Sequence, residues 1–357
     1  MKTILQAAIT AALISAPVVS AVADVQIYGS VQAEYSVEDL DGQASEQGID
    51  DNAFRSNIGF KATEKLGNGL TAIALLEFAA DPTSDTQGLS SNNQQFVGLK
   101  HEKWGFIALG TFKSPYRTTA ESIDPFYETN LQAAGAGGQT TGAGVLGSTD
   151  FVRSAVYYKS PTWNSLTFDF VISPDEKAAN GDLDQENGVK NGDDNSYAAA
   201  INYKKGPLAA FVAFGENSHD DGNDETAVKV GGSFNVGAHT LSGQYEWIQD
   251  SNALGFGQQN TNVNGVSDFS SITTGDDGDV WFLGYQFKAG NNTFIAQYGQ
   301  TESDSDLVTA NDSEYFAVGM IHSFSKRTSL FAGYSETDGD NNAADREVFS
   351  LGLRKDF

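Results

Sequence analysis

Side chains that could perform enzymatic chemistry are few in this sequence. The chain has no cysteine, which excludes thiolate metal sites, disulfides and thiol nucleophiles. Histidine, the usual general base, occurs at His101, His219, His239 and His322. Three of these lie near short turns, and His219 stands beside Asp220 in a polar segment, so no nucleophile, base and orienting group come together. These residues do not indicate catalysis, and an enzymatic function is kept only as an alternative.

Carboxylates are the abundant reactive group, and two Asp-rich segments, HDDGNDE and TDGDNNAADRE, could bind a hard cation. Counted from Asp338, however, an EF-hand would need glycine where Ala343 stands and glutamate where Phe349 stands. The glycine-rich stretch at 135–144 has neither the GxGxxG nor the Walker spacing of a phosphate-binding loop. We therefore expect no specific metal site and no cofactor.

Another group of carboxylates lies in the longest polar segment, 114–150. Glu121, Asp124 and Glu128 fall in its first half, near Pro125 and Phe126, and its second half is rich in glycine. An ordered segment of this length is usually functional, and the alternative is an ordinary solvated loop. Carboxylates gathered in a narrow opening would raise the local concentration of cations.

The net charge of the whole chain is also strongly negative, which likewise favours cations. Its 357 residues include 47 acidic and 21 basic side chains, for a net charge of −26, which disfavours nucleic acid as a partner. Residues 1–23 read MKTILQAAITAALISAPVVSAVA, with the lysine, apolar stretch and A-x-A site of a cleaved signal peptide. Pro17 and the short apolar stretch disfavour a membrane anchor, so the folded domain is expected over 24–357.

Within 24–357, stretches of alternating apolar and polar residues are separated by polar runs. Sixteen such stretches can be counted, from 24–36 to 345–357. In SLTFDFVIS, for example, Leu166, Phe168 and Phe170 share one face, opposite Asp169. Links after even-numbered stretches are short, such as KLGNG at 65–69, and links after odd-numbered stretches are long. Tight turns at a single end are typical of an up-and-down barrel that crosses a membrane.

The last stretch, EVFSLGLRKDF, explains how such a barrel would close. Phe349, Leu351, Leu353 and Phe357 fall on one face, which we expect to meet lipid. The final strand would pair with the first, so that no sheet edge is left open. The predicted fold is all-β, a sixteen-stranded antiparallel transmembrane β-barrel.

Several segments also resemble a known family, the general trimeric porins of Gram-negative outer membranes, in particular the proteobacterial and neisserial branch. The resemblance rests on DVQIYGSVQAEYS, SNIGFKATEKLGNGLTAIALLEF, QFVGLKHEKWGFIALGTF, SAVYYKSPTWNSLTF and LGLRKDF, which sample the chain from end to end. It implies a homotrimer in the outer membrane, in contact with lipid and lipopolysaccharide, that lets small hydrophilic solutes and ions diffuse passively. It also implies that the outer-membrane assembly machinery reads the terminal Phe357.

The resemblance further implies that a loop at about 114–150 folds into the lumen as a constriction. Its acidic side would be Glu121, Asp124 and Glu128. The facing wall should be basic, but three positions where the family usually has arginine hold Asn57, Asn93 and Thr111. The basic residues left for that wall are Arg55, Lys61, Arg153 and Lys159.

Apart from the third link, the polar links at the long-loop end carry 30 acidic residues and only two basic ones, Lys177 and Lys190, over 37–53, 81–93, 174–195, 216–224, 250–278, 303–312 and 336–345. Together with the missing arginines, this excess predicts a pore that prefers cations. A substrate-specific channel for a sugar or an ion stays open as an alternative. A barrel enzyme or an adhesin would share the fold, but neither explains the long third link.

Overall fold

The computed structural model describes residues 24–40, 44–51, 55–83, 88–90, 93–133, 151–174, 195–217, 225–251, 276–303, 312–339 and 345–357. The expected signal peptide, 1–23, and Lys177 and Lys190 lie outside these ranges. Among the described residues, no helix is both long and apolar enough to span a membrane.

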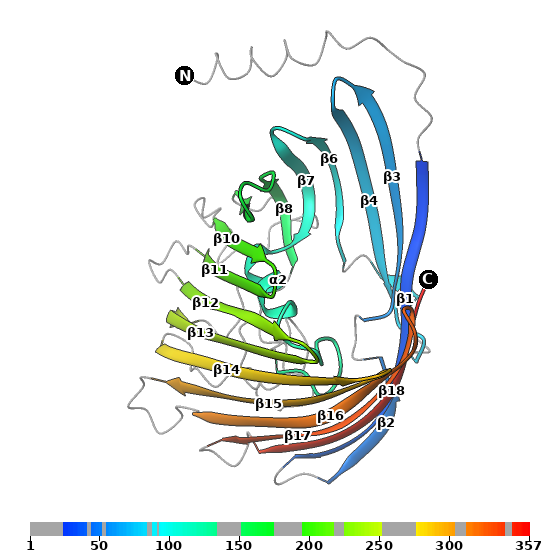
Figure 1. Ribbon diagram of the computed structural model, residues 1–357, viewed down its shortest axis with the longest axis vertical. Coiled ribbons are helices and arrows are strands. Elements are labelled where there is room, and N and C mark those ends of the chain that lie inside the picture. The colour runs from blue at the N-terminus through cyan, green and yellow to red at the C-terminus, as the bar shows by residue number, and fades with distance from the viewer. Residues whose placement is uncertain are drawn as a thin grey trace, which may run out of the picture.

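The described chain forms one closed antiparallel sheet (Figure 1). The barrel strands, in chain order, are β1 (Asp24–Leu40), β3 (Asn57–Gly67), β4 (Leu70–Ala80), β6 (Gln95–His101), β7 (Gly105–Lys113), β8 (Phe151–Lys159), β9 (Leu166–Ser173), β10 (Ser196–Lys205), β11 (Leu208–Asn217), β12 (Glu225–Val236), β13 (His239–Ser251), β14 (Asp276–Ala289), β15 (Asn292–Ser303), β16 (Ser313–Ser325), β17 (Thr328–Gly339) and β18 (Arg346–Asp356). Each pairs with the next, and β1 pairs with both β3 and β18. The predicted sixteen-stranded barrel is therefore confirmed.

Two short strands were missed in segments expected to be loops. β2 (Glu46–Asp50) pairs with the end of β1, and β5 (Leu89–Ser90) pairs with the end of β4. These strands are polar or very short, so they carry little apolar alternation for a sequence pattern to detect. Their backbone groups still gain partners by pairing, whatever their side chains are.

The two faces of the wall differ as the alternation predicts. On β18, Phe349, Leu351 and Leu353 are 41–50 % exposed on the outer face, whereas Ser350 is fully buried on the inner face. The same contrast separates Phe168 from the buried Asp169 on β9. Large apolar side chains exposed around the outside of a barrel form the band that contacts lipid.

The two ends of the barrel also differ. At one end, which we call the tight-turn rim, neighbouring strands join by short turns; the turn from β3 to β4 uses left-handed backbone at Gly67, Asn68 and Gly69. At the opposite end, the loop-side rim, β1 ends at Leu40 and β18 begins at Arg346. Phe357 lies at the tight-turn rim, where its N–H donates to the Gly29 carbonyl over 3.0 Å.

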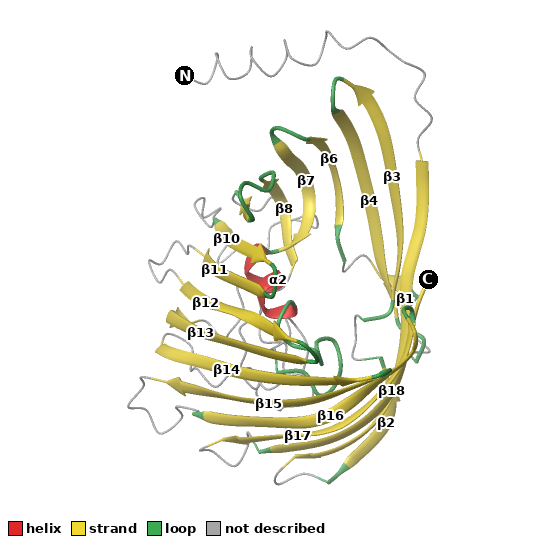
Figure 2. Cartoon of the chain, viewed as in Figure 1, coloured by secondary structure: helices red, strands yellow, loops and turns green. Residues whose placement is uncertain are grey.

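The third long link enters the barrel. After β7, the helix α2 (Pro115–Glu121) and the turns that follow it, 122–133, lie inside the strand wall (Figure 2). We call residues 114–133 the inward loop. The remainder of the expected constriction segment, 134–150, lies outside the described residues.

Candidate functional site

The inward loop begins with a capped helix. Ser114 is the N-cap, and its Oγ accepts a hydrogen bond from the Arg117 N–H over 2.9 Å. Pro115 follows in the first turn, where a missing N–H costs nothing. These two residues fix where the chain leaves β7, and the helix then buries Tyr116, Thr119 and Ala120.

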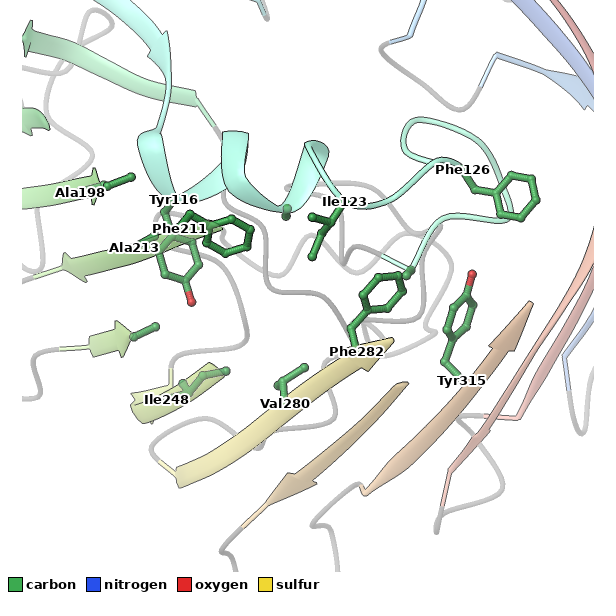
Figure 3. Packing of buried hydrophobic residues seen from close by; sticks show 14 of the residues in the cluster. Tyr116, Ile123, Phe126, Ala198, Phe211, Ala213, Ile248, Val280, Phe282 and Tyr315 are labelled. Carbon is green, nitrogen blue, oxygen red and sulfur yellow. The ribbon is translucent and has the colours of Figure 1, made fainter. Parts of the chain in front are cut away.

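Apolar contacts hold the loop against the wall. Ile123, Phe126 and Leu131 are at most 3 % exposed and belong to one cluster with Phe282 and Tyr315 of the wall (Figure 3).

Two facing glycines make room for these contacts. Gly319 and Gly333 pair across β16 and β17. A Cβ at Gly319 would lie 2.8 Å from Phe126 Cζ, and one at Gly333 would lie 2.7 Å from Leu131 Cδ1. The wall therefore supplies the space for close packing of the loop.

Asp124 does not lie where the sequence analysis expected it. It is 4 % exposed, and its Oδ1 accepts from the Phe126 N–H over 2.9 Å and from Gln297 Nε2 over 2.7 Å. Its Oδ2 accepts from the Ala133 N–H over 2.9 Å. A carboxylate used in this way shapes the loop and ties it to β15, so Asp124 is a structural residue of the inward loop rather than a charge facing the opening.

Glu128 does face the opening, from a strained backbone. Its φ of 60° is left-handed, which is unusual for a residue other than glycine, asparagine or aspartate. The Glu128 N–H donates to Gln132 Oε1 over 2.8 Å, and its carbonyl accepts from Gln32 Nε2 over 2.7 Å. Its carboxylate lies 3.0 Å from Arg55 Nη1 and 3.6 Å from Lys113 Nζ. The surrounding bonds therefore hold a strained residue so that its charge points into the lumen.

Glu121 stands beside the same cations. One carboxylate oxygen lies 2.9 Å from Lys113 Nζ and 3.0 Å from Arg117 Nε. Burial alone would raise the pKa of this carboxyl group, but Lys113 and Arg117 outweigh that effect and hold the pKa below its ordinary value. Glu121 is therefore ionised at neutral pH, and its negative charge is compensated by Lys113 and Arg117.

Glu128 and its three cationic partners border a cavity of about 340 Å³, the constriction cavity. Its described lining is polar and charged apart from Gly29 and Phe357: Tyr28, Ser30, Arg55, Asn57, Glu77, Asn93, Gln94, Lys113, Arg117, Glu128 and Asp356. Asn57 and Asn93, two of the positions where the family usually has arginine, are among these lining residues. Thr111 lies in β7 at a bulge, where the register with β8 shifts.

The expected basic wall is dispersed. Arg55 lies at the cavity, just before β3 rather than within it. Lys61 is on the inner face of β3, four residues nearer the tight-turn rim than Asn57, or about 13 Å along the strand. Lys159 pairs with Asp169 over 2.7 Å, and Arg153 is exposed on β8. Of the four residues, the structure brings only Arg55 to the loop carboxylates.

Three cations near the loop were missed by the sequence analysis. Lys113 ends β7, Arg117 is on α2, and Arg354 of β18 donates to Gln32 Oε1 over 2.7 Å beside the loop. Arg117 could have been found, because it precedes Glu121 by four residues in a segment with a helix-capping start. Lys113 could not, because its partners come from the folding back of the loop.

Comparisons with known proteins agree on one class. The family model for Gram-negative porins matches residues 7–342. The chain is 28% identical over 344 residues to a major outer membrane protein P.IB of Neisseria gonorrhoeae, covering 91% of each chain, and 24% identical over its full length to an outer membrane porin protein of Bordetella pertussis. A solved structure named as an anion-selective porin from Comamonas acidovorans has a TM-score of 0.72 at 18% identity, covering 94% of this chain and all of the other. Salmonella typhi OmpF gives a TM-score of 0.67 at 14% identity and covers 93% of this chain and 97% of the other.

Proposed function

The chain belongs to the family of Gram-negative porins and is an outer-membrane channel for small solutes, and we propose that it works as a general-diffusion pore that prefers cations. The observation that carries the proposal is the inward loop, which narrows a closed barrel around a polar cavity of about 340 Å³. A small, wet and polar opening admits hydrophilic solutes by size.

The charges at this opening favour general diffusion over a specific site. Of the described residues that line the constriction cavity, Arg55, Lys113 and Arg117 are positive, and Glu77, Glu128 and Asp356 are negative. Glu128 lies within 4.0 Å of all three cations. A solute would have to displace these pairs to bind, so the opening is suited to passage rather than capture.

The source of the cation preference therefore differs from the one that the sequence suggested. Glu121 and Glu128 are compensated by neighbouring cations, and Asp124 is buried in the loop. We propose that the preference arises mainly at the loop-side rim, where carboxylates greatly outnumber basic groups. The 30 acidic and two basic residues of the long links other than 114–150 support this location. The likeness to the Comamonas porin extends to the fold alone, so its named selectivity does not transfer.

Swelling of proteoliposomes tests general diffusion directly. We expect entry rates for uncharged sugars to fall smoothly with solute size and to stay proportional to concentration. Saturation with one sugar, at a rate above that of smaller sugars, would favour a substrate-specific channel instead. Liposomes without protein provide the baseline.

We also propose that the protein is a homotrimer, that its outer face contacts membrane lipid and lipopolysaccharide, and that assembly machinery reads Phe357. The Phe357 ring is 46 % exposed, and burying a phenylalanine contributes only about 2 kcal/mol, so its loss would little affect a finished barrel. We expect Phe357→Ala to lower the amount of trimer in the outer membrane, measured by electrophoresis of unheated samples. Equal amounts of wild-type and variant trimer would refute the assembly role.

A further inference from the structure

Two charged residues are buried in the barrel wall away from the constriction cavity. Lys229 of β12 and Glu246 of β13 lie directly opposite each other and are 0 % and 2 % exposed. Nearby positions on the same strands hold small or neutral residues, namely Gly231, Ser242 and Gln244. Burying a lysine and a glutamate is unfavourable compared with such neutral residues, so the pair is not explained by the needs of the wall.

Both charges contact the same residue of the inward loop. The Lys229 ammonium lies 3.8 Å from the centroid of the Tyr116 ring, which is the geometry of a cation–π interaction. The Tyr116 hydroxyl donates to Glu246 Oε1, and Glu246 Oε2 accepts from Gln244 Nε2 over 2.9 Å. Tyr116 itself is 1 % exposed and points from α2 into the wall beside Phe211 (Figure 3). One tyrosine therefore joins the helix to both charges.

Beyond Tyr116, the helix carries Arg117, which lines the constriction cavity, and its ion-pair partner Glu121. Arg117 is the immediate neighbour of Tyr116, and Glu121 is one further turn along. The Arg117 guanidinium also lies 4.7 Å from the centroid of the Phe151 ring, so its position depends on how the helix docks. A rotation of α2 about its axis would move Arg117 and Glu121 together, because both are fixed to the same short helix.

We propose that Lys229 and Glu246 are positioning residues of the channel, which dock α2 on the wall through Tyr116 and so set where the Arg117–Glu121 pair stands in the opening. The proposal rests on the channel function and adds a mechanism for its width. A hydrogen bond to a charged group is strong enough to change the ratio of docked to undocked loop by roughly ten- to a hundred-fold.

The chain offers a matched pair of substitutions for the test. Tyr116→Phe removes the hydroxyl that donates to Glu246 and keeps the ring above Lys229, whereas Tyr116→Leu removes both contacts. Tyr157→Phe is the control, because the Tyr157 hydroxyl also donates to a buried carboxylate, Asp169, over 2.8 Å, but joins two wall strands and not the loop. Lys229→Met provides an independent variant on the wall side.

Two measurements are made on the folded protein in its native oligomeric state. In planar bilayers, we expect the fraction of time in reduced-conductance levels to rise about ten-fold for Tyr116→Phe, further for Tyr116→Leu, and not for Tyr157→Phe. The second measurement does not depend on conduction. Because the chain lacks cysteine, a spin label on Thr118→Cys, an exposed position of α2, reports helix mobility alone.

The outcomes separate the two proposals. A more mobile label in Tyr116→Phe and Lys229→Met, with no change in Tyr157→Phe, supports docking even in a protein that fails the swelling test. An unchanged label and unchanged conductance levels in folded Tyr116→Phe and Lys229→Met would overturn the docking role. Equal changes in Tyr116→Phe and Tyr157→Phe would also overturn it, because they would show a general effect of losing a wall hydrogen bond.

Discussion

The constriction and the loop-side rim use carboxylates in opposite ways. In the constriction, Glu121 and Glu128 each lie within 4.0 Å of at least two cations. At the loop-side rim, on the outer face of the strands, carboxylates face carboxylates across neighbouring strands: Glu314 pairs with Asp338, Glu336 with Glu347, and Glu347 with Asp39. Like charges in register cost some stability, and the exposure of these side chains to water limits that cost.

The number of charges in a region therefore does not by itself show how strongly that region affects ion selectivity. The ion pairs in the constriction hold the inward loop in place, because each charge is held by short contacts. The electric fields of the paired charges largely cancel. The rim carboxylates named above accept hydrogen bonds from neutral groups such as Gln300 and form no ion pair among the described residues, so their fields add and reach about 8 Å into physiological saline. We therefore assign the shape of the opening to the first region and the cation preference to the second.

The largest expected effect comes from breaking the balance in the constriction. Glu128→Gln keeps the side-chain shape but leaves Arg55, Lys113 and Arg117 with less compensation. One unit charge at 4 Å contributes about 1 kcal/mol even in water, so we expect the ratio of cation to anion permeability to fall about five-fold or more. Reversal potentials in a KCl gradient measure this ratio.

The reciprocal substitution serves as the control. Lys113→Met removes one cation from the same cluster and should shift the ratio toward cations. Shifts of the same sign in both variants would contradict the balance of charge that we infer at the constriction.

A smaller effect is expected from acid, and it should separate the two regions. Asp51, which precedes β3 near the loop-side rim, has its pKa raised to about 6 by burial and by the nearby Asp81. A raised pKa means that Asp51 takes up its proton early as the pH falls, whereas the lowered pKa of Glu121 means that its ion pairs last until below the ordinary carboxyl range near pH 4.

As the pH falls from 7 to 4, cation preference should therefore weaken before the loop pairs are lost. The two quantities are recorded together at each pH: the reversal potential reports the loop-side rim, and the single-channel conductance reports the constriction. Asp51→Asn should reduce the change seen near pH 6. Loss of the conductance level before any change in reversal potential would contradict this order.

The sequence was sufficient to predict the strands of the barrel, but it was insufficient to predict the roles of the residues at the constriction. Strand positions follow from local alternation, as on β9 and β18, because each side chain must face either lipid or the lumen. The role of Asp124 could not be predicted, since its partner Gln297 is 173 residues away. Arg55 was predicted on the wall that faces Glu128, but Lys113 was missed, because it approaches Glu128 only after the loop folds back.

The role of the loop-side rim in cation preference is tested most directly by the reversal potential of the wild-type channel beside a rim variant, Glu314→Gln/Glu336→Gln/Glu347→Gln, at low and high salt. We predict a cation-selective wild type, a clear loss of selectivity in the variant at roughly 0.01 M KCl, where fields reach about 30 Å, and little difference near 1 M, where they reach about 3 Å. The conductance level at 1 M should stay unchanged, because the constriction is intact. Anion selectivity in the wild type, or equal selectivity of both proteins at low salt, would contradict the assignment of cation preference to the loop-side rim.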